Sequence, residues 1–149
     1  MRYFLDTEYN GWGGALLSLA LVPDRGDDLY LTLDWTCELE PWVERNVLPY
    51  LDTVPLPMVS PRLSRRDAAH FVAHYLAGDP NPEIIADWPE DIAQLSMLLV
   101  TGAGMMEEVP PLIFRFMPLS GFSTAATSRV PHNALHDARA LRDHVLSLE

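Results

Sequence analysis

Cysteine, long apolar runs and basic side chains are all scarce in this sequence of 149 residues. The single Cys37 excludes an internal disulfide and a zinc cluster built on cysteines. No apolar run approaches the roughly 18 residues that a membrane span requires, and the opening residues MRYFLDTEYN lack a signal-peptide pattern. We therefore expect a cytoplasmic protein that has no membrane partner.

The charge balance limits the partners further. There are 10 basic residues against 21 acidic ones, and the formal net charge is −11. This argues against broad binding to a phosphate backbone. A polyanion still suits the protein if bound metal ions invert the charge of clustered acids. Any nucleic acid is then expected to be held at one end, in a small site, rather than along a basic groove.

The residue pattern predicts one α/β domain over residues 1–149. Residues 2–6 and 15–22 are apolar enough for strands, and residues 29–35 alternate in the way of a half-buried antiparallel strand. Further strands, in PEIIADW and PPLIFRFMPLSG, alternate with helical segments in the second half. We expect an antiparallel meander of three strands that parallel strands extend, with helices packed on the faces of this mixed sheet.

Helices are predicted where apolar residues recur at helical spacing. These segments are residues 40–51, the stretch from the N-cap Ser64 to Gly78, the stretch that begins near Pro89, and the C-terminal residues 132–149. In the last of them Ala134, Leu135, Ala138 and Leu141 are expected to face the core. Residues 123–131, STAATSRVP, are expected to form a loop.

Two acids close the first strand. Asp6 and Glu8 are two residues apart, so their side chains point to the same face of the strand. Neighbouring like charges repel and raise each other's pKa. A divalent cation relieves this repulsion, because hard cations prefer clustered carboxylate oxygens. The pair therefore predicts a metal site that needs further ligands.

Two later segments supply candidates for those ligands. In EIIADWPEDIAQL, Asp87 ends a strand and Asp91 lies in the first turn of a helix; in PHNALHDARAL, His132 comes five residues before Asp137. Each fragment alone is common, and acids near helix starts often serve as caps or dipole partners. The ordered combination of all three segments is more specific.

This order of motifs resembles the DEDDh family of 3′–5′ exonucleases, whose fold is ribonuclease-H-like. FLDTEYNG, IIADWPEDIAQL and HNALHDARAL look like its three motifs, and the two ends of the chain look most like small bacterial exoribonucleases. The resemblance implies that two divalent cations, Mg²⁺ or Mn²⁺, are held by four carboxylates: Asp6, Glu8, Asp91 and Asp137. It also implies that His132 is the general base. The second motif departs from the family pattern at Glu90, and Asp87 competes with Asp91 for the ligand role.

The implied activity is hydrolysis of terminal phosphodiesters at the 3′ end of single-stranded RNA or DNA, with RNA favoured, to release nucleoside 5′-monophosphates. The resemblance also implies a homodimer. Two alternatives stay open. One is a phosphohydrolase that uses the same metal site on nucleotides or dinucleotides, which the low basic content favours slightly. The other is a non-catalytic ribonuclease-H-like interaction module.

Several aromatic and histidine residues have more than one interpretation. Tyr9 or Trp12 can stack on a terminal base, or Trp12 covers the edge of the sheet. Trp88 is expected to pack in the core and His136 to lie on the surface. The pair His70 and His74 lacks the context of a metal motif.

Overall fold

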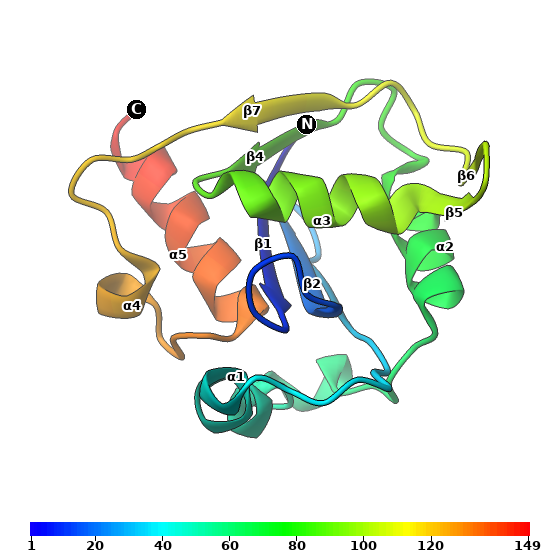
Figure 1. Cartoon of the computed structure of the whole chain (residues 1–149). Helices are drawn as coiled ribbons and strands as arrows, with labels where there is room; N and C mark the ends of the chain where they lie inside the picture. Colours follow the sequence, from blue (N-terminus) through cyan, green and yellow to red (C-terminus); the bar gives the residue numbers. More distant parts are fainter.

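The structure, a computed structural model, describes residues 1–149 and is built on a five-stranded mixed sheet (Figure 1). The strands of this sheet are β1 (Arg2–Tyr9), β2 (Leu16–Pro23), β3 (Leu29–Thr32), β4 (Glu83–Ala86) and β7 (Ile113–Phe116). Their order is β3-β2-β1-β4-β7. The first three strands pair antiparallel, and β4 and β7 extend the sheet in parallel, as expected. A separate hairpin pairs β5 (Val100–Gly102) with β6 (Met105–Met106).

Each predicted helical segment contains a helix, and two short helical turns, Leu56–Met58 and Thr124–Thr127, lie outside these segments. The helices and turns are α1 (Pro41–Asn46), the 3₁₀ turns η1 (Leu48–Tyr50) and η2 (Leu56–Met58), α2 (Arg65–Leu76), α3 (Pro89–Leu99), α4 (Thr124–Thr127) and α5 (Ala134–Ser147). Ser64 caps α2 by accepting a hydrogen bond from the amide of Asp67. The expected loop at 123–131 is wrong in part, because the carbonyl of Ser123 accepts from two later amides and closes one helical turn, α4. None of the helices combines the length and apolar content needed to cross a membrane.

Both faces of the sheet are covered, because alternate residues of the central strands pack on different helices. Leu5 joins a cluster with Val72 of α2 and Leu95 of α3, whereas Phe4 joins a second cluster with Leu135 and other residues of α5. In Figure 1, α5 lies on one side of β1, and α3 with α2 on the other. The four residues predicted to be the apolar face of the last helix all belong to the second cluster.

The strand at 29–35 differs from its prediction. It ends at Thr32, and it is not half-buried, because α5 covers the face that was expected to meet solvent. Tyr30 is buried on that face, and its hydroxyl donates a hydrogen bond of 2.7 Å to the carbonyl of Leu51. Leu31, on the other face, joins the cluster under α2 and α3.

The first turn of α5 is held in place beside the C-terminal ends of β1 and β4. Asn133 is fully buried there and caps the helix: its side-chain oxygen accepts from the amides of Leu135 and His136. Its side-chain amide donates 2.8 Å to the carbonyl of Tyr50. One side chain thus ties the first turn of α5 to η1, and it sets the position of the neighbouring residues His132 and Asp137.

Replacing Asn133 with Ala is expected to destabilise the protein by about 2–3 kcal/mol, because the helix loses its cap and a buried carbonyl loses its donor. Chemical denaturation measures this. Asn81→Ala, at an exposed position, is the matched control and should change stability by less than about 0.5 kcal/mol. Equal stability of the two variants would contradict the anchoring role.

Candidate functional site

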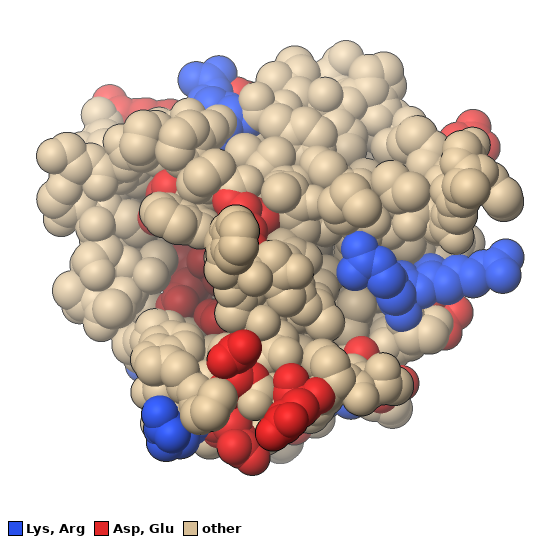
Figure 2. Space-filling view, viewed as in Figure 1, with Lys and Arg blue, Asp and Glu red and all other residues tan.

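A cleft of about 510 Å³ lies where β1 and β4 end. It brings together all five predicted site residues, together with Asp87: its wall includes Asp6, Glu8, Asp87, Asp91, His132 and Asp137. Figure 2 shows acidic side chains inside a hollow on this face and more of them below it, over α1, whereas the visible basic side chains lie apart from the hollow. The cleft is therefore a concentration of negative charge.

Asp6 and Glu8 lie on the α5 side of β1, the side that Phe4 also faces. Burial, and then repulsion from Asp91, raise the pKa of Asp6 well above its usual value. Burial, and then repulsion from Asp137, raise the pKa of Glu8 to about 8. The expected crowding of the two acids is present, and each has a further carboxylate close by.

Asp91 reaches the cleft from the opposite side of the sheet. It is buried in the first turn of α3, and its Oδ1 accepts hydrogen bonds from the amide (3.2 Å) and the hydroxyl (2.6 Å) of Thr7. Burial raises the pKa of Asp91 to about 7 even though these bonds favour its ionised form. Among the carboxylates that repel Asp6, Asp91 contributes most and Asp87 least.

Thr7 is a residue that the sequence reasoning missed. It is the middle residue of the Asp-x-Glu pair, so it points to the face opposite Asp6 and Glu8, where α3 lies. By binding one oxygen of Asp91 it fixes the rotation of that carboxylate and leaves the other oxygen free. The only signal in the sequence was a hydroxyl residue at that middle position.

Asp137 and His132 form the α5 side of the cleft. The backbone amide of His132 donates 3.1 Å to Oδ2 of Asp137, while Oδ1 of Asp137 is buried and has no partner. Burial raises the pKa of Asp137. A ring nitrogen of His132 and carboxylate oxygens of Glu8 and Asp137 all lie within 4.8 Å of one another. His132 is thus near enough to act on a group bound by these acids, or to bind a cation with them.

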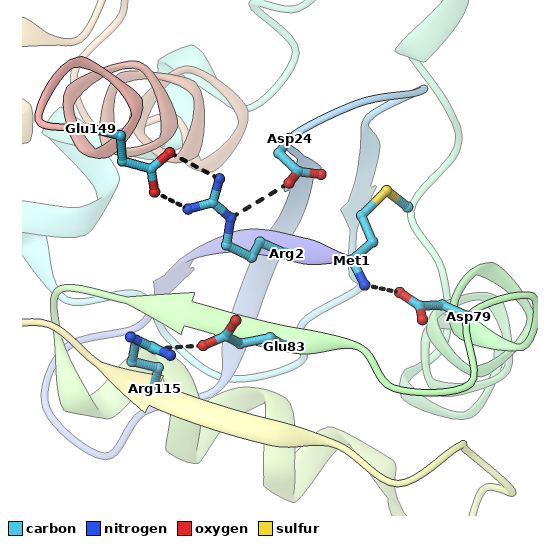
Figure 3. A network of polar contacts seen from close by, with 7 residues as sticks. All are labelled: Met1, Arg2, Asp24, Asp79, Glu83, Arg115 and Glu149. Carbon is cyan, nitrogen blue, oxygen red and sulfur yellow. Dashed lines mark hydrogen bonds and ion pairs between the residues drawn. The ribbon is translucent and has the colours of Figure 1, made fainter.

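The opposite edge of the sheet shows what is unusual about the cleft (Figure 3). There each carboxylate drawn has a cation: Asp24 and Glu149 pair with Arg2, Asp79 with the Met1 ammonium, and Glu83 with Arg115. These contacts lower the pKa of Asp79 and of Glu149. The four carboxylates of the cleft have no such partner, and their pKa values are raised instead.

The donor set of the cleft suits a hard divalent cation. It consists of carboxylate oxygens, the ligands that Mg²⁺ and Mn²⁺ prefer. The buried Oδ1 of Asp137 has no hydrogen-bond partner, and a divalent cation would offset the cost of its buried charge. The residues present therefore fit the expected metal ions.

The rim of the cleft is aromatic. Trp12, Trp42 and Trp88 line it, with 96%, 51% and 58% of their surface exposed. The expectation that Trp88 packs in the core is wrong, because the chain turns from β4 into α3 at this residue and directs the indole outward. Trp12 is too exposed to cover the edge of the sheet.

The loop that carries Trp12 is held on two sides. Asn10 donates 2.9 Å to the carbonyl of Glu38 and accepts 2.7 Å from the amide of Glu40. On the other side Glu90 accepts 2.8 Å from the amide of Gly13. A side chain at Gly14 would lie 1.8 Å from the carbonyl oxygen of Asn10, so this turn requires glycine. Hydrogen bonds on both sides thus hold the loop that carries the exposed Trp12 indole.

The remaining histidines lie outside the cleft. The expected surface position of His136 is wrong: it is buried, and its Nε2 lies 2.9 Å from the carbonyl of Thr53, to which it donates. Burial lowers the pKa of this imidazole. His70 is exposed on α2, 3.8 Å from Glu107, and belongs to no group of metal-ligating side chains.

Without divalent cations, the unfolding temperature should fall as pH rises from about 4.5 to about 8. The raised pKa values of Glu8 and Asp91 mean that the folded protein keeps protons that the unfolded chain releases, so ionisation favours unfolding. Thermal melts in EDTA measure this, and Mn²⁺ should restore stability at the upper end of the range. Glu8→Gln should flatten the profile. A melting temperature that rises over the range would contradict the raised pKa values.

Thr7→Val should weaken Mn²⁺ binding by about tenfold, because Asp91 loses the hydroxyl that orients it. Isothermal titration calorimetry measures the affinity. Thr32→Val is the matched control, since the Thr32 hydroxyl is buried without a partner. Unchanged affinity in Thr7→Val would show that this hydroxyl does not prepare the site.

In comparisons with known proteins, no family profile and no curated protein matches this chain.

Proposed function

We propose that this protein is a metal-dependent 3′–5′ exonuclease of the DEDDh type with a ribonuclease-H-like fold. One observation carries the proposal: a single cleft gathers Asp6, Glu8, Asp91, Asp137 and His132 from distant parts of the chain, and no arginine pairs with the acids. The antiparallel meander, extended by two parallel strands, is compatible with that fold. The order of the motifs supports the family.

The neighbours of each carboxylate suggest how two cations would be held. Asp91 and Asp137 both repel Asp6 and Glu8, so the four acids act as one charged group that two cations could share. These residues would hold two divalent ions, which would supply a lower pKa for the attacking water and stabilisation of the leaving oxygen in an in-line phosphoryl transfer. Thr7 and the His132 amide each bind one oxygen of a ligand carboxylate and leave the other free.

His132 is the proposed general base. It follows Pro131 and precedes the buried Asn133, and its imidazole lies in the cleft beside Glu8 and Asp137. Imidazole is the side chain whose ordinary pKa best suits proton transfer near neutral pH. Because the proton of the attacking water must pass to a nearby acceptor, the ring is well placed to take it.

The rim supports a single-stranded nucleic-acid end as the substrate. Three exposed indoles surround the acids, and aromatic faces stack on any base, at about 1–3 kcal/mol each. The chain has ten arginines and no lysine, and five of the arginines are engaged in ion pairs. A long basic track is therefore lacking, which favours short strands. The preference for RNA rests on the resemblance alone.

The lack of a long basic track also favours the second candidate, a phosphohydrolase for nucleotides or dinucleotides, since a small substrate needs few phosphate contacts.

A homodimer is also proposed. It is supported by the edge strand β7, whose four residues are all exposed and include Ile113, Phe114 and Phe116.

A time course on a 5′-labelled single-stranded RNA oligonucleotide and its DNA equivalent tests the proposal. We expect a ladder that shortens from the 3′ end with Mn²⁺ and no cleavage with EDTA. Asp6→Asn and Asp137→Asn should abolish cleavage, because the cations lose a ligand, and both variants should stay folded. Cleavage of free nucleotides or dinucleotides but not of either oligonucleotide would favour the phosphohydrolase. No cleavage of any substrate, together with no Mn²⁺ binding, would favour the interaction module.

The His132→Ala variant distinguishes whether the imidazole is a general base or a metal ligand. As a general base, its loss should lower turnover by about 10²–10⁴ while Mn²⁺ affinity stays the same. Turnover and calorimetry measured on one preparation decide this. A large loss of Mn²⁺ affinity would instead make His132 a metal ligand alongside Glu8 and Asp137. Wild-type turnover would remove it from the mechanism.

A further inference from the structure

Trp42 makes the one aromatic contact to the imidazole of His132. The two rings meet edge to face, with centroids 4.9 Å apart and an interplanar angle of 80°. A ring nitrogen of the imidazole also lies within 4.8 Å of carboxylate oxygens of Glu8 and Asp137. No hydrogen bond within the chain holds the ring itself, because the bond from His132 to Asp137 comes from the backbone amide. The indole is therefore a neighbour that can limit how the imidazole turns.

The backbone of His132 is already fixed. It is the only non-glycine residue with a positive φ, 63°, a conformation that side chains with a Cβ seldom adopt. Its amide bonds to Asp137, and the following residue, Asn133, is fully buried. This unusual conformation directs the side chain into the cleft but leaves the rotation of the ring free.

The helix that carries Trp42 is held by packing that does not involve the indole. Next to Trp42 in α1, Val43 is buried in a cluster with Val47, Leu17 and Leu51. Half of the indole surface is exposed, so it adds little to that cluster. Trp42 can accordingly be replaced without removing the packing that holds α1.

We propose that Trp42 is a positioning residue for His132: its ring holds the imidazole toward the carboxylates and so places the base. This inference rests on the proposed function. An edge-to-face contact has a preferred geometry and restricts both rings, and a base must keep a narrow geometry to act, because a displacement of about 1 Å is enough to lose much of its effect. Trp42 acts through His132 and need not touch the reacting atoms.

Trp42→Ala and Trp42→Phe, each with and without His132→Ala, test the proposal in the full-length protein. Trp42→Ala should lower kcat by roughly tenfold, a part of the 10²–10⁴ that a general base supplies. Trp42→Phe should recover most of that loss, because a phenyl ring can keep the edge-to-face contact. In the His132→Ala background the loss of Trp42 should change kcat little, since there is no imidazole left to place.

Trp12→Ala is the contrasting variant, because that indole lines the same cleft but has no contact with His132. It should raise KM and leave kcat nearly unchanged. If Trp42 only stacks on a substrate base, Trp42→Ala will behave in the same way, and its effect on KM will persist in the His132→Ala background. That result would overturn the proposal.

A readout independent of catalysis separates this inference from the proposed function. The ring protons of His132 in an NMR spectrum should carry a ring-current shift that Trp42→Ala removes and Trp12→Ala leaves in place. If the shift changes as expected but the wild-type protein cleaves no substrate, the proposed function fails and the contact stands. If Trp42→Ala leaves the His132 resonances unmoved, the positioning role is wrong whatever the activity.

Discussion

Repulsion among buried and half-buried carboxylates at one edge of the sheet is the constraint on which the site depends. Asp6, Glu8, Asp91 and Asp137 share the cleft. Burial raises all four pKa values, and repulsion from neighbouring carboxylates, Asp87 among them, adds to the shift. At the other edge of the same sheet every drawn carboxylate has a cation within reach. The same sheet thus has ion-paired carboxylates at one edge and carboxylates without an ion pair at the other. The difference is hard to explain by stability alone, because an uncompensated cluster destabilises the folded state.

The cluster forms because the two faces of the sheet contribute to it separately. Asp6 and Glu8 point toward α5, which supplies Asp137, while Thr7 points the other way and holds Asp91 on α3. A strand whose two faces are both covered can therefore bring a helix from either side to a single edge. This requires that α5 begin at the end of β1, and the buried Asn133 fixes that start.

Local patterns in the sequence predicted much of this arrangement. The paired acids on β1, the mixed sheet and the apolar face of α5 follow from periods of two and 3.6 residues, and the structure has each of them. The errors concern residues whose surroundings come from far along the chain. His136 is buried because its partner, Thr53, lies 83 residues away, and Thr7 meets Asp91 across 84 residues. The position of Tyr30 was predicted wrongly because no local pattern tells which face another helix will cover. Trp88 was predicted wrongly because it lies at the turn from β4 into α3.

The acidic surroundings of the cleft also affect how fast a polyanion arrives. A phosphate that approaches a protein of net charge −11 meets a repulsive field whose range, the Debye length, is about 10 Å at 0.1 M salt. Added salt shortens that range, so encounters should become faster with ionic strength, the reverse of what basic nucleic-acid-binding proteins show. Each further nucleotide adds a charge to be repelled. For the proposed nucleic-acid substrate, this repulsion would favour short fragments over long strands before any contact is made.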